Sequence, residues 1–166
     1  VMSKNLKMVV GLGNPEDRYA RTLHNAGFWF ADELARRFSG EFRYEKRFNA
    51  EVCKVSITGR EVWLAKPQSY MNLSGKPVRA MLDYYRLDTG TTLVAHDEID
   101  LPPGTVRFKS DGGHGGHNGL KDVIRHCGRD FMRRSTKRSK LQSKVIQHEN
   151  ISQRLSIEQI SAISGP

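Results

Sequence analysis

The chain has 166 residues, with 27 Lys and Arg side chains against 18 Asp and Glu, and a formal net charge of +9 at pH 7. This length suits one domain around one core. The positive charge favours a polyanionic partner, and nucleic acid fits better than a membrane surface, because no apolar run approaches the roughly 18 residues of a membrane span. Residues 1–5 contain no apolar signal-peptide core. We therefore expect a cytosolic protein in which Cys53 and Cys127 are reduced core thiols.

Apolar periodicity along the chain alternates between that of strands and that of helices. In chain order we expect a strand over 6–12, a helix over 28–38, an antiparallel hairpin over 50–58 and 61–66, a helix that begins near Pro77, strands over 92–95 and 106–109, and a helix from about Leu120 to Cys127. Strands that alternate with helices predict an α/β fold. The hairpin makes the sheet mixed.

Four loops follow the expected strand ends, where ligands of open α/β sheets bind. The loop 111–119 is the most unusual, because five of its nine residues are glycines, placed around two histidines and an asparagine. Glycine clusters allow close approach of the backbone to a ligand, whereas a plain linker has no need of imidazoles. One cleft can therefore collect the distinctive residues of all four loops: Asn14, His24, Met71, Asn72, Asp97, His114, His117 and Asn118.

Two cofactor interpretations fit these residues poorly. The turn after the first strand resembles a dinucleotide-binding turn, with Asp32 as the ribose ligand, but Glu16 replaces its third glycine and Pro15 disturbs it. A metal site is the second possibility, but a glycine-rich loop does not by itself fix coordination geometry. Its candidate ligands are His96, Asp97, His114 and His117. We expect neither an organic cofactor nor a metal.

The remaining chemistry is that of a histidine general base oriented by a carboxylate, with asparagines as neutral hydrogen-bonding groups and water as the nucleophile. A neutral imidazole can deprotonate water near pH 7, and an aspartate fixes its tautomer. The chain has no Gly-x-Ser-x-Gly elbow that would supply a covalent nucleophile. This combination suits hydrolysis of an ester.

Five ordered motifs carry a resemblance to the bacterial peptidyl-tRNA hydrolase family. They are Val10–Pro15, Arg21–Gly27, Tyr70–Gly75, His96–Gly104 and Gly112–Asp122, with Tyr19 between the first two, and the match covers about residues 6–131. The resemblance implies a single α/β domain with a twisted mixed β-sheet flanked by helices. It also implies hydrolysis of the ester that joins a peptide to the 3′ end of tRNA, by a monomer without metal or organic cofactor.

Carried over by position, the resemblance makes His24 the catalytic base and Asp97 the residue that orients it. Asn14 would hold water or substrate beside His24. The substrate pocket would be formed by Tyr19, Met71, Asn72, His117 and Asn118. Lys109 matches a family position that grips a tRNA phosphate. His96 and His114 are interpreted as structural or rim residues.

The resemblance stops after Phe131, so we expect a hydrolase-like α/β domain over 1–131 and a basic, atypical C-terminal segment over 132–166, which either belongs to the same domain or is partly disordered. Residues 133–144 contain six basic and no acidic side chains. This stretch fits RNA binding and a solvated tail equally well. It has almost no apolar residue, so no central strand is expected within 132–144. The alternative function is a catalytically inactive RNA-binding homologue on the same scaffold.

Overall fold

The computed structural model describes residues 6–19, 25–97, 105–109, 116–134 and 142–147, and the side chains within 6–18, 25–97 and 116–128. Its elements in chain order are β1 (Met8–Gly11), η1 (Asp17–Tyr19), α1 (Ala26–Arg37), β2 (Arg43–Glu45), β3 (Ala50–Ile57), β4 (Arg60–Pro67), η3 (Met71–Leu73), α2 (Gly75–Tyr85), η4 (Thr89–Thr91), β5 (Thr92–Asp97), β6 (Thr105–Lys109), α3 (Asn118–Arg134) and β7 (Gln142–Gln147). No helix in these ranges is long and apolar enough to span a bilayer.

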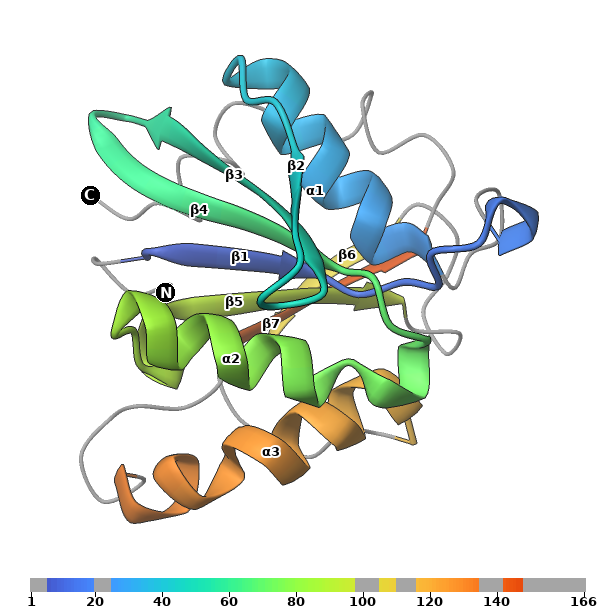
Figure 1. The fold of residues 1–166 in the computed structure, drawn as a ribbon, viewed down its shortest axis with the longest axis vertical. Helices are drawn as coiled ribbons and strands as arrows, with labels where there is room; N and C mark the ends of the chain where they lie inside the picture. Colours follow the sequence, from blue (N-terminus) through green and yellow to red (C-terminus); the bar gives the residue numbers. More distant parts are fainter. Residues whose placement is uncertain (1–5, 20–24, 98–104, 110–115, 135–141, 148–166) are drawn as a thin grey trace.

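The strands form one mixed sheet in the order β2-β3-β4-β1-β5-β7-β6 (Figure 1). Strand β1 pairs in parallel with β4 and β5, and β5 pairs in parallel with β7. The remaining pairs, β2 with β3, β3 with β4, and β6 with β7, are antiparallel. The predicted α/β fold with a mixed sheet and flanking helices is confirmed, and the carboxyl ends of β1, β4 and β5 meet at one edge.

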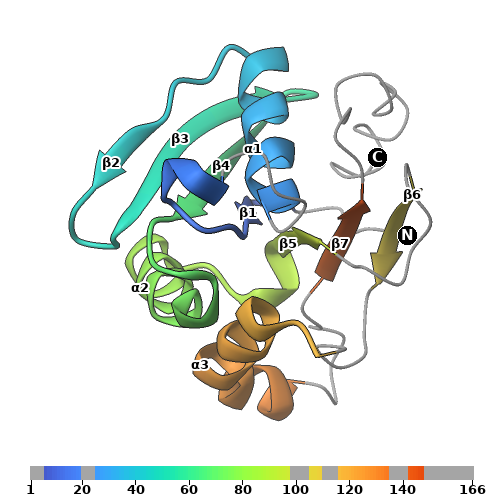
Figure 2. The same cartoon turned by 90° about the vertical axis from the view of Figure 1, so that its right-hand side faces the viewer.

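Helices cover both faces of the sheet, with α1 on one face and α2 and α3 on the other (Figure 2). Alternation along β1 produces this division: Val9 packs in the core cluster under α1, whereas Met8 and Val10 pack in the cluster under α2 and α3. Cys53 and Cys127 are both buried thiols. Burial raises the pKa of Cys53 to about 11, so this thiol stays protonated and unreactive at neutral pH.

The predicted hairpin is confirmed as β3 and β4, paired from Ala50 opposite Pro67 to Ile57 opposite Arg60. Its tight turn consists of Thr58 with φ 51° and Gly59 with φ +80°. Two consecutive residues with positive φ give a turn whose twist matches that of the flanking strands. The turn fixes the register, so the start of β3 lies beside the end of β4.

The expectation that no strand occurs within 132–144 is wrong, because β7 begins at Gln142. It lies inside the sheet, pairing with β5 from Leu93 opposite Gln142 to Asp97 opposite Ile146, and with β6 on its other side. The six residues of β7 include only two apolar ones, so the pattern of its side chains does not identify it as a strand. The backbones of β5 and β6 each present an edge that needs hydrogen-bonding partners, and a central strand satisfies both.

Candidate active site

The candidate site lies where β1, β4 and β5 end, at the edge of the sheet that faces right in Figure 1. Three loops or element ends meet there: the chain after β1, the segment between β4 and α2, and the last residues of β5. The first turn of α3 closes the group, since Gly119 contacts Met71 of η3. The predicted convergence of distant loops at one sheet edge is thus what the described part of the chain shows.

Asn14 holds two of these loops together. Its backbone N–H donates to Oδ1 of Asn25 at 2.7 Å, and Nδ2 of Asn25 donates back to the Asn14 carbonyl at 2.9 Å. The backbone N–H of Met71 donates to Oδ1 of Asn14 at 2.7 Å. The bond from Met71 to its amide oxygen orients the Asn14 side chain and leaves its amide N–H groups as donors for a ligand. The site therefore has a rigidly held hydrogen-bond donor at this position.

Met71 and Gly119 fit against each other closely. Met71 is buried, with 3% of its surface exposed, and a Cβ added at Gly119 would lie 2.4 Å from Met71 Sδ. A side chain at position 119 would push the Met71 thioether out of its place, so glycine permits this close approach of the α3 N-terminus to η3. Asn72, which follows Met71, and Asn118, which precedes Gly119, are both exposed and lie at the surface of the site.

Asp97 ends β5 and is paired with His117, just before α3. Nε2 of His117 lies 2.7 Å from Asp97 Oδ1, and the backbone N–H of Leu120 donates to His117 Nδ1 at 3.1 Å. Since Nδ1 accepts, the proton belongs on Nε2, which donates to the carboxylate. His117 therefore acts as the N-cap of α3 and anchors the helix to Asp97. With both nitrogens engaged, it is poorly suited to act as a base.

His96 contacts both members of the pair of Asp97 and His117. It is 2% exposed, its Nδ1 lies 2.8 Å from the Asp97 carbonyl oxygen, and its ring meets that of His117 edge-on at 4.7 Å. These contacts agree with the structural role predicted for His96. They also hold the Asp97 carboxylate at the end of its strand, with 9% of the side chain exposed.

The described residues include most, but not all, of the predicted site. Asn14, Met71, Asp97 and His117 come together, and Asn72 and Asn118 flank them. His24 and His114 lie outside the described residues. For two others, the backbone belongs to a described element and the side chain does not: Tyr19 in η1 and Lys109 at the end of β6. The assigned roles of all these residues remain predictions.

Sequence reasoning missed two contacts that shape the site. Asn25 is 3% exposed and clamps Asn14, as given above; its place beside His24 in the motif was the available signal. Tyr70 OH donates to a carboxylate oxygen of Glu16, and Arg18 pairs with the other oxygen at 2.6 Å. This second contact links the loop after β1 to the segment before η3. No periodic pattern in the sequence predicts this contact.

The described residues named in the two cofactor interpretations have other contacts. Asp32, the ribose ligand of the dinucleotide interpretation, lies on α1, where its Oδ1 accepts from Lys66 Nζ of β4 at 2.6 Å. Among the described residues, no three His, Cys, Asp or Glu side chains form a group that could hold a metal ion. The groups that are present, an amide donor and a buried carboxylate beside an imidazole, suit binding and proton transfer.

Comparison with known proteins agrees with this chemistry. The family model described as peptidyl-tRNA hydrolase matches residues 8–136. Curated peptidyl-tRNA hydrolases of Alkalilimnicola ehrlichii and Neisseria meningitidis are both 51% identical, over 125 and 122 residues, which is 75% and 74% of this chain. The chain spans 64% of the length of each.

Solved structures give the same result. The crystal structure of peptidyl-tRNA hydrolase from Acinetobacter baumannii superposes with a TM-score of 0.77 at 35% identity, covering 100% of this chain and 80% of that one. An Arg119Gln mutant of the A. baumannii protein gives 0.78 at 34% identity, covering 99% and 84%. The family model, the relatives and the fold agree, and the chain belongs to the peptidyl-tRNA hydrolase family.

Proposed function

We propose that this protein is a peptidyl-tRNA hydrolase, which cleaves the ester between a peptide and the 3′ end of tRNA. One observation carries the proposal: the ends of β1, β4 and β5 bring the Asn14 amide and the Asp97 carboxylate to one sheet edge. His24 is covalently joined to Asn25, whose side chain clamps Asn14. Membership of the family supports the same reaction.

The proposed mechanism begins with attack by water. His24 takes a proton from the water as its oxygen adds to the ester carbonyl, and Asp97 stabilises the imidazolium that forms. The tetrahedral intermediate collapses, the C–O bond to the terminal ribose breaks, and His24 returns the proton to the leaving oxygen. The products are a peptide carboxylic acid, which loses its proton to bulk water, and a tRNA with a free hydroxyl. General-base assistance contributes on the order of 10²- to 10⁴-fold.

The remaining residues are assigned to binding and polarisation. Asn14, as a donor, suits the oxygen of the attacking water or the oxyanion that develops on the carbonyl. We assign Tyr19, Met71, Asn72, His117 and Asn118 to the substrate pocket, following the family pattern. Neither a metal nor an organic cofactor has a step in this scheme. We further infer that the protein acts as a monomer in the cytoplasm, where translation supplies its substrate.

The direct test is hydrolysis of an N-acetylated aminoacyl-tRNA by the purified chain, with a chelator present. We expect release of free tRNA and N-acetyl amino acid with multiple turnovers. A folded protein that binds tRNA and leaves the ester intact would overturn the proposal and favour the inactive RNA-binding homologue.

Replacement of Lys109 by alanine tests the tRNA contact at the edge strand β6. If Lys109 neutralises one phosphate, Lys109→Ala weakens tRNA binding, and the slope of log K against log salt becomes shallower by about one. Binding measured over a salt series for wild type and variant gives both quantities. An unchanged slope would remove the phosphate contact from the account.

A further inference from the structure

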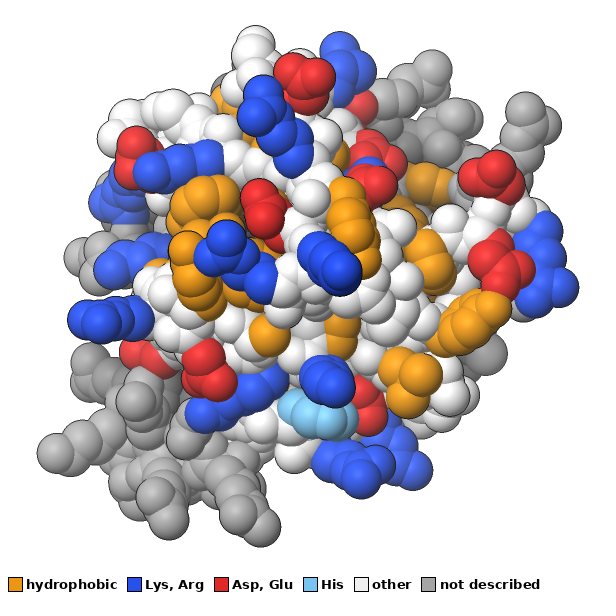
Figure 3. Space-filling model, in the orientation of Figure 1, with side chains coloured by type: hydrophobic (Ala, Val, Ile, Leu, Met, Phe, Trp, Pro, Cys, Tyr) orange, Lys and Arg blue, Asp and Glu red, His pale blue; other side chains and the backbone are white. Residues whose placement is uncertain are grey.

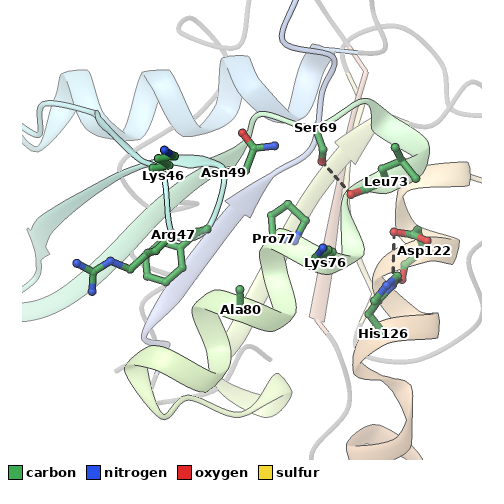
Figure 4. A pocket seen from close by; sticks show the side chains of 11 residues that line it. Lys46, Arg47, Asn49, Ser69, Leu73, Lys76, Pro77, Ala80, Asp122 and His126 are labelled. Atoms are coloured by element: carbon green, nitrogen blue, oxygen red, sulfur yellow. Dashed lines mark hydrogen bonds and ion pairs between the residues drawn. The ribbon is translucent and has the colours of Figure 1, made fainter.

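A groove of about 450 Å³ lies beside the candidate site, between the β2–β3 turn and helices α2 and α3 (Figure 4). This volume falls in the range of roughly 300–1,000 Å³ that is typical of ligand sites. Lys46, Arg47 and Asn49 of the turn lie at one end of the groove, Ser69 and Leu73 at the other, with α2 between them. None of the roles assigned above uses this groove.

The groove has a positively charged rim. Lys46 and Lys76 are exposed on opposite sides of it, and within the described part of the chain neither has a carboxylate partner. Arg47 adds a third positive charge, although its guanidinium also lies over the ring of Tyr84 at 4.6 Å and 3.9 Å from Glu45. Lysines and arginines are prominent on this face of the molecule (Figure 3). Charge complementarity therefore favours an anionic ligand.

Among the described residues that line the groove, the one carboxylate is already engaged. Asp122 of α3 is 9% exposed, and its Oδ2 accepts from the backbone N–H of Gly75 at 2.7 Å. It thereby caps the N-terminus of α2, where a negative charge is favourable. His126 lies 3.5 Å from the same oxygen. Because Asp122 is satisfied by these groups, it leaves the charges of Lys46 and Lys76 available to a ligand.

The walls between these charges are apolar and carry no open aromatic face. Pro77, Ala80 and Leu73 line the groove, with Leu73 54% exposed. Among the described residues that line the groove, Phe48 is the aromatic one, and it is 5% exposed. Single-stranded RNA is usually held by bases stacked on exposed aromatic rings. An extended peptide, whose side chains alternate between apolar and charged contacts, fits these walls better.

The groove also has the right position for the peptide arm of a peptidyl-tRNA. The β2–β3 turn lies at the same sheet edge as the site, because Ala50 pairs with Pro67 and Gln68 N–H donates to the Asn49 carbonyl at 2.8 Å. Leu73 directly follows Asn72 in η3. Lys109, proposed to hold tRNA, is on β6, the outer strand on the opposite side of the sheet from β2. If the ester lies between Lys109 and the groove, the RNA and the peptide extend from it in opposite directions.

We propose that this groove binds the peptide portion of peptidyl-tRNA and favours peptides with acidic side chains, which meet Lys46 and Lys76. The proposal rests on the hydrolase function proposed above. The strength of each exposed charge contact is modest, so wild type should hydrolyse an Asp- and Glu-rich peptidyl-tRNA with a kcat/KM roughly three- to tenfold above that of the matched Asn- and Gln-rich substrate.

The test compares Lys46→Glu, Lys76→Glu and the control Lys7→Glu, which make the same change of charge. Lys7 is exposed at the amino end of β1, away from the site. We expect each groove variant to remove or reverse the preference for the acidic substrate, with N-acetyl-aminoacyl-tRNA, which has no peptide to reach the groove, cleaved at the wild-type rate. Lys7→Glu should leave the preference unchanged.

Two results of the hydrolysis test would overturn the inference. An equal loss on acidic, neutral and single-residue substrates would mean that the groove holds RNA. No preference in wild type, or a preference that both variants keep, would mean that the groove binds neither the RNA nor acidic peptides.

If no substrate is hydrolysed, the hydrolase proposal fails separately. Fluorescence anisotropy of a labelled acidic oligopeptide then tests whether the groove binds acidic peptides. Binding weakened by both groove variants supports the groove, and an absence of binding by wild type overturns it.

Discussion

Asp97→Asn is expected to lower kcat for N-acetyl-aminoacyl-tRNA by about a hundredfold or more, with little change in thermal stability. An amide at this position keeps an oxygen that accepts from His117 Nε2, so the anchor of α3 survives. The lost negative charge is the one assigned to fix the tautomer of His24 and to stabilise its imidazolium, so the rate falls into the range that general-base assistance contributes. Single-turnover kinetics together with a thermal melt measure both quantities.

Asp122→Asn is the matched control, because Asp122 is a carboxylate of similar burial on a neighbouring element, 9% exposed against 7% for Asp97. It caps α2 and has no assigned part in the chemistry. We expect it to lower stability by about 1 kcal/mol while kcat stays within about threefold of wild type. If Asp97→Asn behaves like this control, Asp97 is a structural residue only.

Gly27→Ala is expected to destabilise the protein by about 3 kcal/mol or more. Gly27 is in the first turn of α1, and a Cβ there would lie 2.4 Å from the Ala95 carbonyl oxygen and 2.5 Å from the backbone nitrogen and oxygen of Leu12. These atoms belong to the chain of β5 and to the residue after β1, and Leu12 N–H donates to that same Ala95 oxygen at 2.9 Å. Backbone in a central sheet cannot yield cheaply, so overpacking costs are large.

Thermal denaturation checks this prediction, with Gly128→Ala as the control for the same chemical change. Gly128 lies in α3, and a Cβ there would come no closer than 3.5 Å to Ile124 Cγ2. Alanine in a helix interior should stabilise by about 0.5–1 kcal/mol relative to glycine. A melting temperature of Gly27→Ala within about 2 °C of wild type would show that α1 can move away from the sheet, contrary to the packing described.

The strands and helices that could be predicted are those whose side-chain pattern matches their burial. Val9 on one face and Met8 and Val10 on the other identify β1, and Val78 and Met81 mark the buried face of α2. The strand β7 could not be predicted, because its place depends on hydrogen bonds that β5 and β6 leave open. Its own sequence contributes only Val145 and Ile146 as apolar residues.

The site was predicted to the extent that it depends on chain order. Parallel strands bring their carboxyl ends together, so the proximity of Asn14, Met71 and Asp97 follows from the order of elements once the sheet is assumed. The detailed contacts do not follow. The bond from His117 to Asp97, and its capping of α3 through Leu120, depend on where a helix axis meets a strand end. Sequence spacing does not contain that geometry.

The measurement that tests the account most directly is hydrolysis of N-acetyl-aminoacyl-tRNA by wild type and by His24→Ala, together with the tRNA affinity of each. We expect turnover by wild type and its loss in the variant, with tRNA affinity within a few fold of wild type, because the base contributes to the chemistry and not to phosphate contacts. Full turnover by His24→Ala would contradict the proposed mechanism at its centre.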